Sequence, residues 1–394
     1  MANPQKAFGD DIMARVQACR ENPQNLERLR IMAVNAVNRL IGNLTMEAGI
    51  GGNDIIEVAL AGNTAMQQIM LGIDPSALGE APFAAAFREA PARDAKTMGL
   101  QSNARGRVYV FPQIGGFVGG DTVAAILATN LPLRRKPALL IDIGTNCEIV
   151  LQSGQHILAA SAAAGPAFEG ARISCGMRAV PGAIAKVKIK NDLHRQVIGN
   201  TRPAGICGSG LMDLAAELLR VGILNDSGRL RAAAELPAGV PAALRRRLRK
   251  HAGRAAFLLA GASETAAGRA LWLTQRDVRE LQAACAAVRA GVALLLKRAR
   301  LKPQNLNCVF LAGLFGGNIR RSSAQRLLLP QIPCAKINFA GNAALIGAAK
   351  SLSAPGVRRA AAASARRAKH VELALDPEFL AVFKVFDVLA YGLI

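Results

Sequence analysis

The spacing of apolar residues predicts alternating helices and strands in the first third of the chain. Apolar side chains recur every three or four positions along one long amphipathic helix: Leu26, Leu29, Ala33, Val37, Leu40 and Leu44. A largely apolar run at 55–61 predicts a strand, and a helix is expected over 65–71. The pattern then repeats, because a strand at 107–111 precedes a glycine turn and a helix at 121–129.

The second part of the chain opens with strands. Hairpin-like strands are expected from 138 to about 160, and a further strand is expected near 183–189. A helix follows Gly208, and after it comes a basic insertion at about 226–270.

Toward the C-terminus the alternation of helix and strand returns. Thr274 and Asp277 have the spacing of a capping box at the start of a long amphipathic helix. A strand at 308–311, a glycine loop, a helix, a short strand and another helix follow. Residues 358–369 are of low complexity, and residues 371–386 predict a closing strand and helix.

This alternation is typical of an α/β fold built in layers, with hairpins in each half. The segment 131–137 reads as a linker because it combines prolines with basic residues. We therefore predict a first lobe over 1–131 and a second lobe over 138–394. The second lobe would contain the basic insertion and the C-terminal strand and helix.

Composition limits the classes of protein to consider. The chain has 394 residues, of which 51% are hydrophobic, enough for one large or two medium domains. No apolar run approaches the roughly 20 residues that a membrane helix needs, and residues 1–11 are too polar for a signal peptide. The seven cysteines are scattered without a Cys-x-x-Cys pair. We therefore expect a cytoplasmic protein with reduced thiols, no membrane span, and no disulfide, zinc site or iron–sulfur cluster.

The formal charge of +22 suggests an anionic partner such as nucleic acid, anionic lipid or an acidic protein. Much of the excess lies in two Ala/Arg-rich stretches, at 229–254 and 358–369. These stretches lack the interleaved aromatic residues on which single-strand binders stack bases. Solvated loops and helix faces are the favoured interpretation, and nucleic acid remains a minor alternative.

The segment around Asp142 is the best candidate for a binding site. A buried strand at 139–143 carries Asp142, and Gly144, Thr145 and Asn146 form the turn that follows. Glycine lets the backbone approach a ligand, and the amide N–H groups of such a turn form an anion-binding nest. The side chains of the turn add donors, and Asp142 would hold Mg²⁺ through water. The alternative is an ordinary hairpin, which also needs glycine in its turn.

Three more glycine turns lie at element junctions, where α/β sheets place ligands: 115–122, 205–210 and 312–318. The last of these would let a purine ring lie on the backbone, and its alternative is a plain strand-to-helix turn. Asp121 follows Gly119 and Gly120 directly. On spacing alone the role of helix N-cap is favoured for Asp121, and the alternative is a carboxylate that orients water or a hydroxyl.

A small-residue loop at 162–171 contains Glu169, which is either a metal or nucleotide contact or a solvated acid in a first helical turn. Cys147 and Cys207 stand beside glycine turns. Both are expected to be inert small residues, and the alternative is a reactive thiol whose pKa is lowered by the turn.

Taken in order, these turns resemble the nucleotide-binding signatures of the actin/sugar-kinase/Hsp70 superfamily. The matching segments are the helix-opening connection 119–125, the second phosphate motif 141–146, the adenosine motif 311–318 and the closing connection 341–348. More specifically, the chain is similar to the C-terminal ATPase-like region of the reductive activators of corrinoid-dependent enzymes. The segments that carry this resemblance span nearly the whole chain: 3–9, 61–66, 141–151, 165–177, 205–213, 273–290 and 311–318.

The resemblance implies an actin-like (ribonuclease H-like) two-lobed ATPase fold that binds ATP and Mg²⁺. It implies that Asp142 takes part in catalysis and holds Mg²⁺ through water, and that Asp121 positions water. The residues that it implies as nucleotide contacts are Gly144, Thr145, Asn146, Gly165, Glu169, Gly208, Ser209, Gly313, Gly316, Gly317 and Asn318. Of these, the three glycines from Gly313 to Gly317 would border the adenosine.

Such proteins use ATP to help reduce inactive Co(II) corrinoid to Co(I), so the implied partner is a corrinoid protein or a corrinoid-dependent methyltransferase. The sequence departs from the family in three respects. It has no cysteine-rich ferredoxin region, so a separate ferredoxin-like electron donor is expected. It begins after the family's first phosphate hairpin, which is missing here, and Cys147 replaces a residue that is usually glycine.

Two alternatives to an ATP-hydrolysing activator stay open. One is a non-catalytic member of the family that docks on a corrinoid protein. The other is a small-molecule kinase of the same superfamily, with Asp121 as general base, because fold-level analogy fixes chemistry poorly. A homodimer is left open as well, and nucleic acid is disfavoured as a partner.

Overall fold

The computed structural model describes residues 3–9, 11–89, 91–313 and 319–389. The chain divides into two compact units. The first unit consists of Met1–Arg135, Gln152–Ala160 and Asn342–Leu375, and the second consists of Lys136–Leu151, Ser161–Gly341 and Asp376–Ile394. Within the described residues, no helix is long and apolar enough to cross a membrane.

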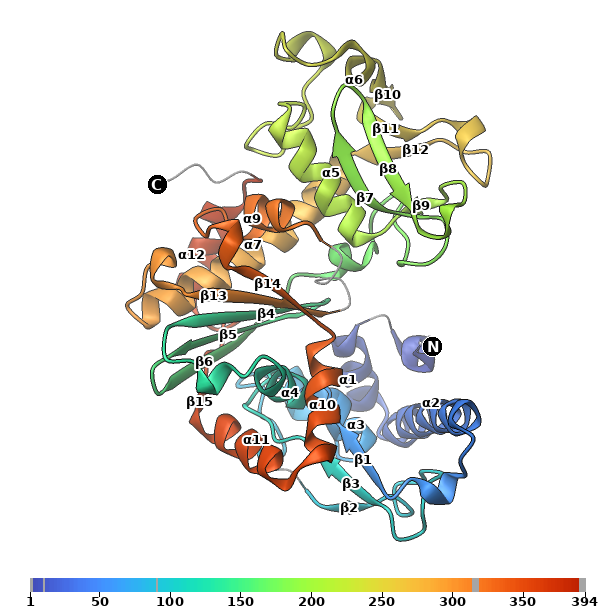
Figure 1. Cartoon of the computed structure of the whole chain (residues 1–394), viewed down its shortest axis with the longest axis vertical. Coiled ribbons are helices and arrows are strands. Elements are labelled where there is room, and N and C mark those ends of the chain that lie inside the picture. Colours follow the sequence, from blue (N-terminus) through green and yellow to red (C-terminus); the bar gives the residue numbers. More distant parts are fainter. Residues whose placement is uncertain (1–2, 10, 90, 314–318, 390–394) are drawn as a thin grey trace. The chain divides into compact units, whose positions relative to one another are not determined.

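The first unit is built on a small sheet with the strand order β1-β3-β2 (Figure 1). Strands β1 and β3 are parallel, whereas β2 and β3 are antiparallel. The helices and strands of this unit are α1 (Ile12–Glu21), α2 (Gln24–Ala48), β1 (Glu57–Leu60), α3 (Thr64–Met70), β2 (Arg93–Asp94), β3 (Arg107–Val110), α4 (Gly120–Ala128), α10 (Ala343–Ser353), α11 (Pro355–Arg367) and β15 (Ala368–His370). Its core packs Val34 and Met70 from α2 and α3 against Val108 and Val110 of β3.

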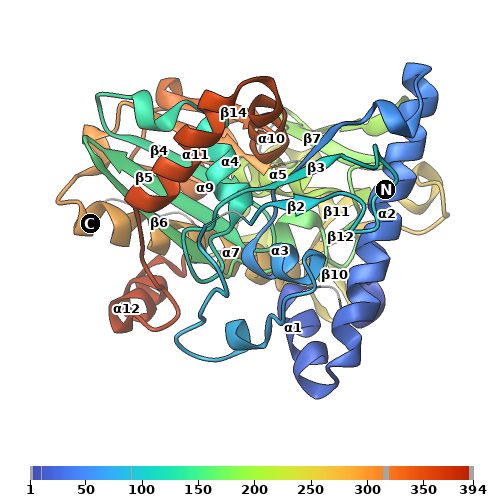
Figure 2. The same ribbon diagram turned by 90° about the horizontal axis from the view of Figure 1, so that it is seen from below.

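Helices α4 and α10 lie against each other in both views of the molecule (Figures 1 and 2). Their backbones meet at Gly347, where a Cβ atom would lie 1.9 Å from the carbonyl oxygen of Ala124. Glycine is therefore the residue that lets the two helices approach so closely. A similar approach occurs at Gly119, where a Cβ atom would lie 2.5 Å from the backbone nitrogen of Thr64.

A larger sheet has the strand order β14-β13-β4-β5-β6-β15. Strand β13 pairs in parallel with both β14 and β4, and β15 pairs in parallel with β6. The bounds of the strands not yet given are β4 (Ala138–Ile143), β5 (Cys147–Ser153), β6 (His156–Ala162), β13 (Cys308–Ala312) and β14 (Ile337–Gly341).

The second unit also contains two three-stranded sheets, β8-β7-β9 and β10-β11-β12 (Figure 1). Their strands and the helices of the unit are β7 (Ala183–Ile189), β8 (Leu193–Val197), β9 (Gly205–Ile206), α5 (Gly208–Arg220), α6 (Ala242–Arg247), β10 (Leu248–His251), β11 (Arg254–Ala260), β12 (Leu271–Thr274), α7 (Gln275–Arg298), α9 (Arg321–Leu328) and α12 (Pro377–Phe386). Helix α7 begins at the capping box that the sequence predicted, in which the Thr274 side chain accepts a hydrogen bond from the backbone N–H of Asp277.

Most of the predicted elements are present, but the prediction of which residues form the buried face of α2 was wrong in the second half of the helix. Leu40 and Leu44 are exposed, and Ile41 is buried in their place. A helix of 25 residues outruns the small sheet it packs on, so periodicity alone does not tell which turns are covered.

The two basic stretches are more ordered than loops. The insertion folds into α6 and the β10-β11-β12 sheet, while 358–369 lies mostly in α11. Arg247 is held by Asp192, and its Nε and Nη2 atoms lie 2.6 and 2.8 Å from the carboxylate oxygens. Arg246, Arg249 and Lys250 are exposed, as a solvated face requires.

The unit boundaries differ from the predicted lobes at the C-terminal side. The predicted linker region coincides with the change of unit at Arg135 and Lys136. Asn342–Leu375, however, groups with the first unit, because α10 and α11 pack on α4. The closing strand, β15, ends at His370, before the segment where the sequence predicted it.

The contact at Gly347 predicts a large effect of one methyl group. Gly347→Ala should lower the free energy of unfolding by about 3 kcal/mol, because the new Cβ meets the Ala124 backbone and not a flexible side chain. Guanidinium denaturation followed by circular dichroism would measure the effect.

Gly42 in α2 is the matched control, because nothing lies within 4 Å of its added Cβ. Gly42→Ala should stabilise the protein by about 0.5–1 kcal/mol through helix propensity alone. Equal unfolding midpoints for the two variants would contradict the close packing of α4 and α10.

Candidate functional site

The candidate phosphate turn lies between two buried strands of the large sheet. In β4, Leu139, Leu140 and Ile141 are buried, so the strand is held on both faces up to Asp142. The bend at 144–146 then leads into β5, where Cys147 is fully buried. The turn therefore extends from a rigid base, which suits a site that must hold its amide groups ready for an anion.

Asp142 is half-buried at the end of β4, and its carboxylate lies in largely desolvated surroundings. Burial raises its pKa to about 6, because removal from water disfavours the ionised form. Within the described part of the chain, no hydrogen bond or ion pair compensates this carboxylate. A cation brought by a ligand would supply the missing counter-charge, and carboxylate oxygen is the donor type that Mg²⁺ prefers.

Gly313 follows β13 and comes close to this carboxylate. Its φ is +92°, and a Cβ atom there would lie 2.5 Å from the carbonyl oxygen of Ile143 and 2.9 Å from Oδ1 of Asp142. The parallel pairing of β13 with β4, in which Ala312 lies opposite Asp142, sets this approach. The structure thus brings together the predicted phosphate turn and the start of the predicted adenosine loop.

Glu169 also belongs to this group of residues. Thr145 Oγ1 donates a hydrogen bond of 2.5 Å to Glu169 Oε1, across 24 positions of sequence. Glu169 ends the short 3₁₀ helix Pro166–Glu169, which packs against α5 and α7. Gly165 precedes it with a φ of +73°, a conformation that favours glycine.

The loop that carries Glu169 is closed by backbone contacts. A Cβ atom on Gly176 would lie 1.8 Å from the carbonyl oxygen of Gly170, so only glycine fits there. Further along, the Ser174 backbone N–H and hydroxyl donate to Asp277 Oδ1 at 2.7 and 2.9 Å. The sequence had suggested Asp277 only as a capping residue, and its bond to Ser174 had no signal in the spacing.

The residues of the glycine turn before α5 make contacts within the protein itself. Gly208 and Ser209 are both buried in the first turn of the helix. The Ser209 hydroxyl donates to the carbonyl oxygen of Ala185 at 2.9 Å. Their predicted role as nucleotide contacts therefore stays a prediction.

The surroundings of Cys147 favour an unreactive thiol. Burial raises the pKa of the Cys147 thiol well above its ordinary value. The thiol also donates to the Gly144 carbonyl oxygen, with 3.6 Å between sulfur and oxygen. The inert role is thus the one that the surroundings favour.

Asp121 belongs to the first unit and is not the N-cap of α4. The N-cap is Gly119, so the helix begins at Gly120 and Asp121 lies in its first turn. The favoured interpretation of Asp121 as an N-cap was therefore wrong, because Gly119 and Gly120 are the residues that fit against Asn63 and Gln67. A carboxylate in a first turn is favourable to the helix dipole, and the Thr122 backbone N–H donates to it at 2.7 Å.

The predicted contacts Gly316, Gly317 and Asn318 lie outside the described residues. Among the residues that are described, no three His, Cys, Asp or Glu side chains gather into a metal-binding group. Asn146 is half-buried in the bend after Gly144, and no described side chain bonds to it.

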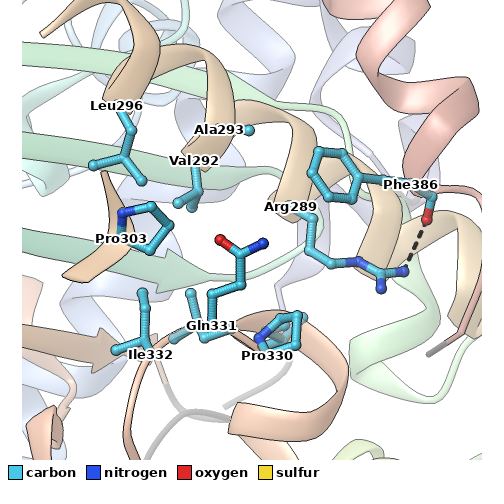
Figure 3. Close-up of a pocket in the computed structure, with 11 residues that line it drawn as sticks. Arg289, Val292, Ala293, Leu296, Pro303, Pro330, Gln331, Ile332 and Phe386 are labelled. Atoms are coloured by element: carbon cyan, nitrogen blue, oxygen red, sulfur yellow. Dashed lines mark hydrogen bonds between the residues drawn. The ribbon is translucent and has the colours of Figure 1, made fainter. Parts of the chain in front are cut away.

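A cavity in the second unit lies apart from these residues. It is lined mainly by apolar side chains of α7, by the segment 328–332 and by Phe386 (Figure 3). Arg289 crosses one side of it and donates to the backbone oxygen of Phe386 at 2.9 Å. None of the described candidate site residues lines this cavity, so it is separate from the candidate phosphate turn.

Comparison with known proteins identifies the family. Residues 136–388 match the model of the C-terminal domain of RACo, the ASKHA domain, and residues 1–134 match that of the RACo middle region. The chain belongs to the RACo family. This result confirms the resemblance stated from the motifs and the two-lobed ATPase fold class that it implied.

Individual relatives agree with the RACo assignment. The chain is 35% identical over 385 residues to the corrinoid activation enzyme RamQ of Eubacterium limosum. This alignment covers 97% of this chain and 64% of RamQ. The chain is 32% identical to a [Co(II) methylated amine-specific corrinoid protein] reductase of Methanosarcina barkeri, over 56% of this chain and 39% of the reductase. A solved structure of a reductive activator for corrinoid, iron-sulfur protein matches with a TM-score of 0.88 at 34% identity, covering 98% of this chain and 61% of that one. The chain thus spans less than two thirds of the length of these RACo-like relatives.

The raised pKa of Asp142 predicts a pH-dependent gain in stability when this carboxylate is removed. Because the folded pKa of about 6 lies above the ordinary 3.8, ionisation of Asp142 destabilises the folded state as the pH rises between these values. Asp142→Asn should therefore stabilise the protein by about 2–3 kcal/mol at pH 7.5 and by less than about 1 kcal/mol at pH 4. Denaturant unfolding at the two pH values would measure this difference.

Asp192 gives the control of opposite sign. Its hydrogen bonds with Arg247 lower its pKa to about 2, so Asp192→Asn should destabilise the protein at pH 7.5. A destabilising Asp142→Asn at pH 7.5 would show that a counter-charge already compensates Asp142.

Proposed function

We propose that this chain binds Mg·ATP at the Asp142 turn and uses it in the reactivation of a corrinoid protein. The observation that carries the proposal is the half-buried, desolvated carboxylate of Asp142, which has no compensating partner among the described residues, beside a glycine-bearing turn in an ASKHA fold. The names of the relatives, which include a corrinoid activation enzyme and a Co(II) corrinoid protein reductase, support the corrinoid part.

The described residues have chemically distinct roles in this proposal. Asp142 binds Mg²⁺ through water, and the amide groups at 144–146 bind phosphate oxygens. Thr145 and Glu169 provide a hydroxyl and a second carboxylate beside them. Gly313 leaves room for the nucleotide next to Asp142, because any larger residue would fill that space.

Catalysis in such a site is positional and electrostatic. Mg²⁺ supplies neutralisation of the phosphate charge when it is bound. The chain's own part is to hold the amide groups and carboxylates in place, since phosphoryl transfer needs little covalent chemistry from the protein. Asp121 keeps its proposed role in orienting water, which an Asp121→Asn variant would test through the rate of phosphate release.

The partners are proposed on the same basis. The substrate of the activation is a corrinoid protein in the inactive Co(II) state, and its reduction to Co(I) takes one electron. We propose a ferredoxin-like donor for that electron. A homodimer is also consistent with the exposed apolar side chains Leu40, Leu44 and Met46 on α2.

Isothermal titration calorimetry with Mg·ATP tests the nucleotide part. The chain should bind with a dissociation constant of about 1 mM or tighter, and Asp142→Ala should abolish binding because Asp142 is the carboxylate that holds Mg²⁺ in this proposal, whereas Glu169 is already hydrogen-bonded to Thr145. Asp192→Ala, which removes an Arg-paired carboxylate in the turn before β8, should leave the affinity unchanged. Nucleotide binding that survives in Asp142→Ala, or none in the folded wild-type chain, would contradict the proposal.

Phosphate release separates an ATPase from a docking module. With Mg·ATP and a corrinoid protein present, an active chain should release phosphate at a rate that Asp142→Ala lowers at least about tenfold, the effect of losing one charge-stabilising group. Association with the corrinoid protein without any phosphate release would favour the non-catalytic alternative.

A further inference from the structure

The carboxylate of Asp277 accepts more hydrogen bonds than the capping of a helix requires. Its Oδ2 accepts from the backbone N–H and the hydroxyl of Thr274, both at 2.8 Å, which completes the capping box of α7. Its Oδ1 accepts from the backbone N–H and hydroxyl of Ser174, which lies 103 positions earlier in the chain. The side chain is fully buried, so these four donors satisfy oxygens that water does not reach.

The segment between Ser174 and Glu169 is short and closed. The Gly170 backbone N–H donates to the Ala167 carbonyl oxygen at 3.0 Å, and the Gly176 N–H donates to Ile173 at 2.9 Å. Gly170 and Gly176 are in backbone contact, since no Cβ fits between them. A shift of Ser174 is therefore passed to Glu169 through a loop with little freedom to absorb it.

A second anchor fixes the C-terminal side of the same loop. The Ile206 N–H donates to the Cys175 carbonyl oxygen at 2.8 Å, and the Met177 N–H donates to the Ile206 carbonyl oxygen at 2.9 Å. These bonds hold the loop to β9, whereas Ser174 holds it to α7. The bonds from Ser174 to Asp277 join the loop to the first turn of α7, beside a 3.4 Å contact between the Ser174 and Thr274 hydroxyls and a bond from the Cys175 thiol to the Trp272 carbonyl oxygen.

We propose that Ser174 and Asp277 form a tether that positions Glu169 against Thr145, and so sets the Mg²⁺ requirement of nucleotide binding. The proposal rests on the proposed function of the Asp142 turn. Ser174 and Asp277 are positioning residues in it, since neither is placed to touch the nucleotide or the metal. Glu169 is the group through which they act, because its hydrogen bond with Thr145 joins the loop to the turn.

Two hydroxyls on one carboxylate give a matched pair of variants. Ser174→Ala removes a donor from Oδ1 on the loop side, and Thr274→Ala removes a donor from Oδ2 on the helix side. Both variants lose the 3.4 Å contact between the two hydroxyls, but only Ser174→Ala loses a bond from the loop to Asp277. Ser174→Thr keeps the hydroxyl, and Ser174 is exposed, so the added methyl has room. All three would be compared with the full-length wild-type chain.

Hydrogen exchange measured by mass spectrometry tests the tether without any ligand. Ser174→Ala should raise the exchange rate of the backbone amides at 165–173, because one of the two bonds that Ser174 makes to Asp277 is lost. Thr274→Ala should raise exchange in the first turn of α7 and leave 165–173 unchanged. Equal exchange at 165–173 in Ser174→Ala and wild type would overturn the tether.

Calorimetric titration with ATP at a series of Mg²⁺ concentrations tests the link to the site. Ser174→Ala should raise the Mg²⁺ concentration for half-maximal ATP binding by about threefold to tenfold, the fold-change that corresponds to one weakened hydrogen bond. Thr274→Ala should lower the melting temperature without changing this requirement, and Ser174→Thr should restore the wild-type value. An unchanged Mg²⁺ requirement in Ser174→Ala, or the same shift in Thr274→Ala, would overturn the proposal.

Together, the exchange and titration measurements distinguish a failure of the proposed function from a failure of the positioning role. If the wild-type chain binds no Mg·ATP, the proposed function falls and the exchange data alone decide whether the tether holds Glu169. If the wild type binds Mg·ATP and only the variants behave alike, the proposed function stands and the positioning role falls.

Discussion

The desolvation of the Asp142 carboxylate is the constraint on which the candidate site depends. The strand that carries it is buried up to the aspartate, and burial raises the pKa of Asp142 to about 6. Holding an ionised group there costs stability, and no described side chain offsets it. Such a cost is characteristic of a functional position, because a bound cation converts it into affinity. In the proposed function, Gly313 and the Glu169 loop keep that position open to a ligand.

Close backbone approach is the second theme of the fold. Gly347 permits the contact of α10 with α4, Gly119 permits that of α4 with the start of α3, and Gly313 leaves space beside Asp142. Each of these glycines belongs to a motif that the sequence resemblance had matched to a nucleotide-binding signature. Two of the three, Gly347 and Gly119, serve packing within the first unit, where an added Cβ would meet the backbone of Ala124 and of Asn63 and Thr64. A family motif can therefore mark a helix contact as readily as a ligand contact.

Local signals predicted well wherever the physics is local. The capping box at Thr274 and Asp277 marked the start of α7, and the strand–turn–strand pattern marked β4 and β5. The site itself depends on contacts between distant positions, which periodicity cannot reveal. Thr145 and Glu169 are 24 positions apart and Ser174 and Asp277 are 103 apart, and only the folded loop brings them together. The helix cap at α4 was misassigned to Asp121 because an aspartate after two glycines looks like a cap, whereas tight packing selects Gly119.

The most direct test is a measurement of the pKa of Asp142 itself. NMR titration of the protein labelled with ¹³C at aspartate carboxyl groups, with Asp142→Asn to assign the signal, would give the value with and without Mg·ADP. We expect a pKa of about 6 for Asp142 in the free chain and a fall of at least about one unit when Mg·ADP is bound, because a nearby cation favours the ionised form. A free pKa near 4, or a pKa that Mg·ADP leaves unchanged, would contradict the claim that this carboxylate awaits a cation.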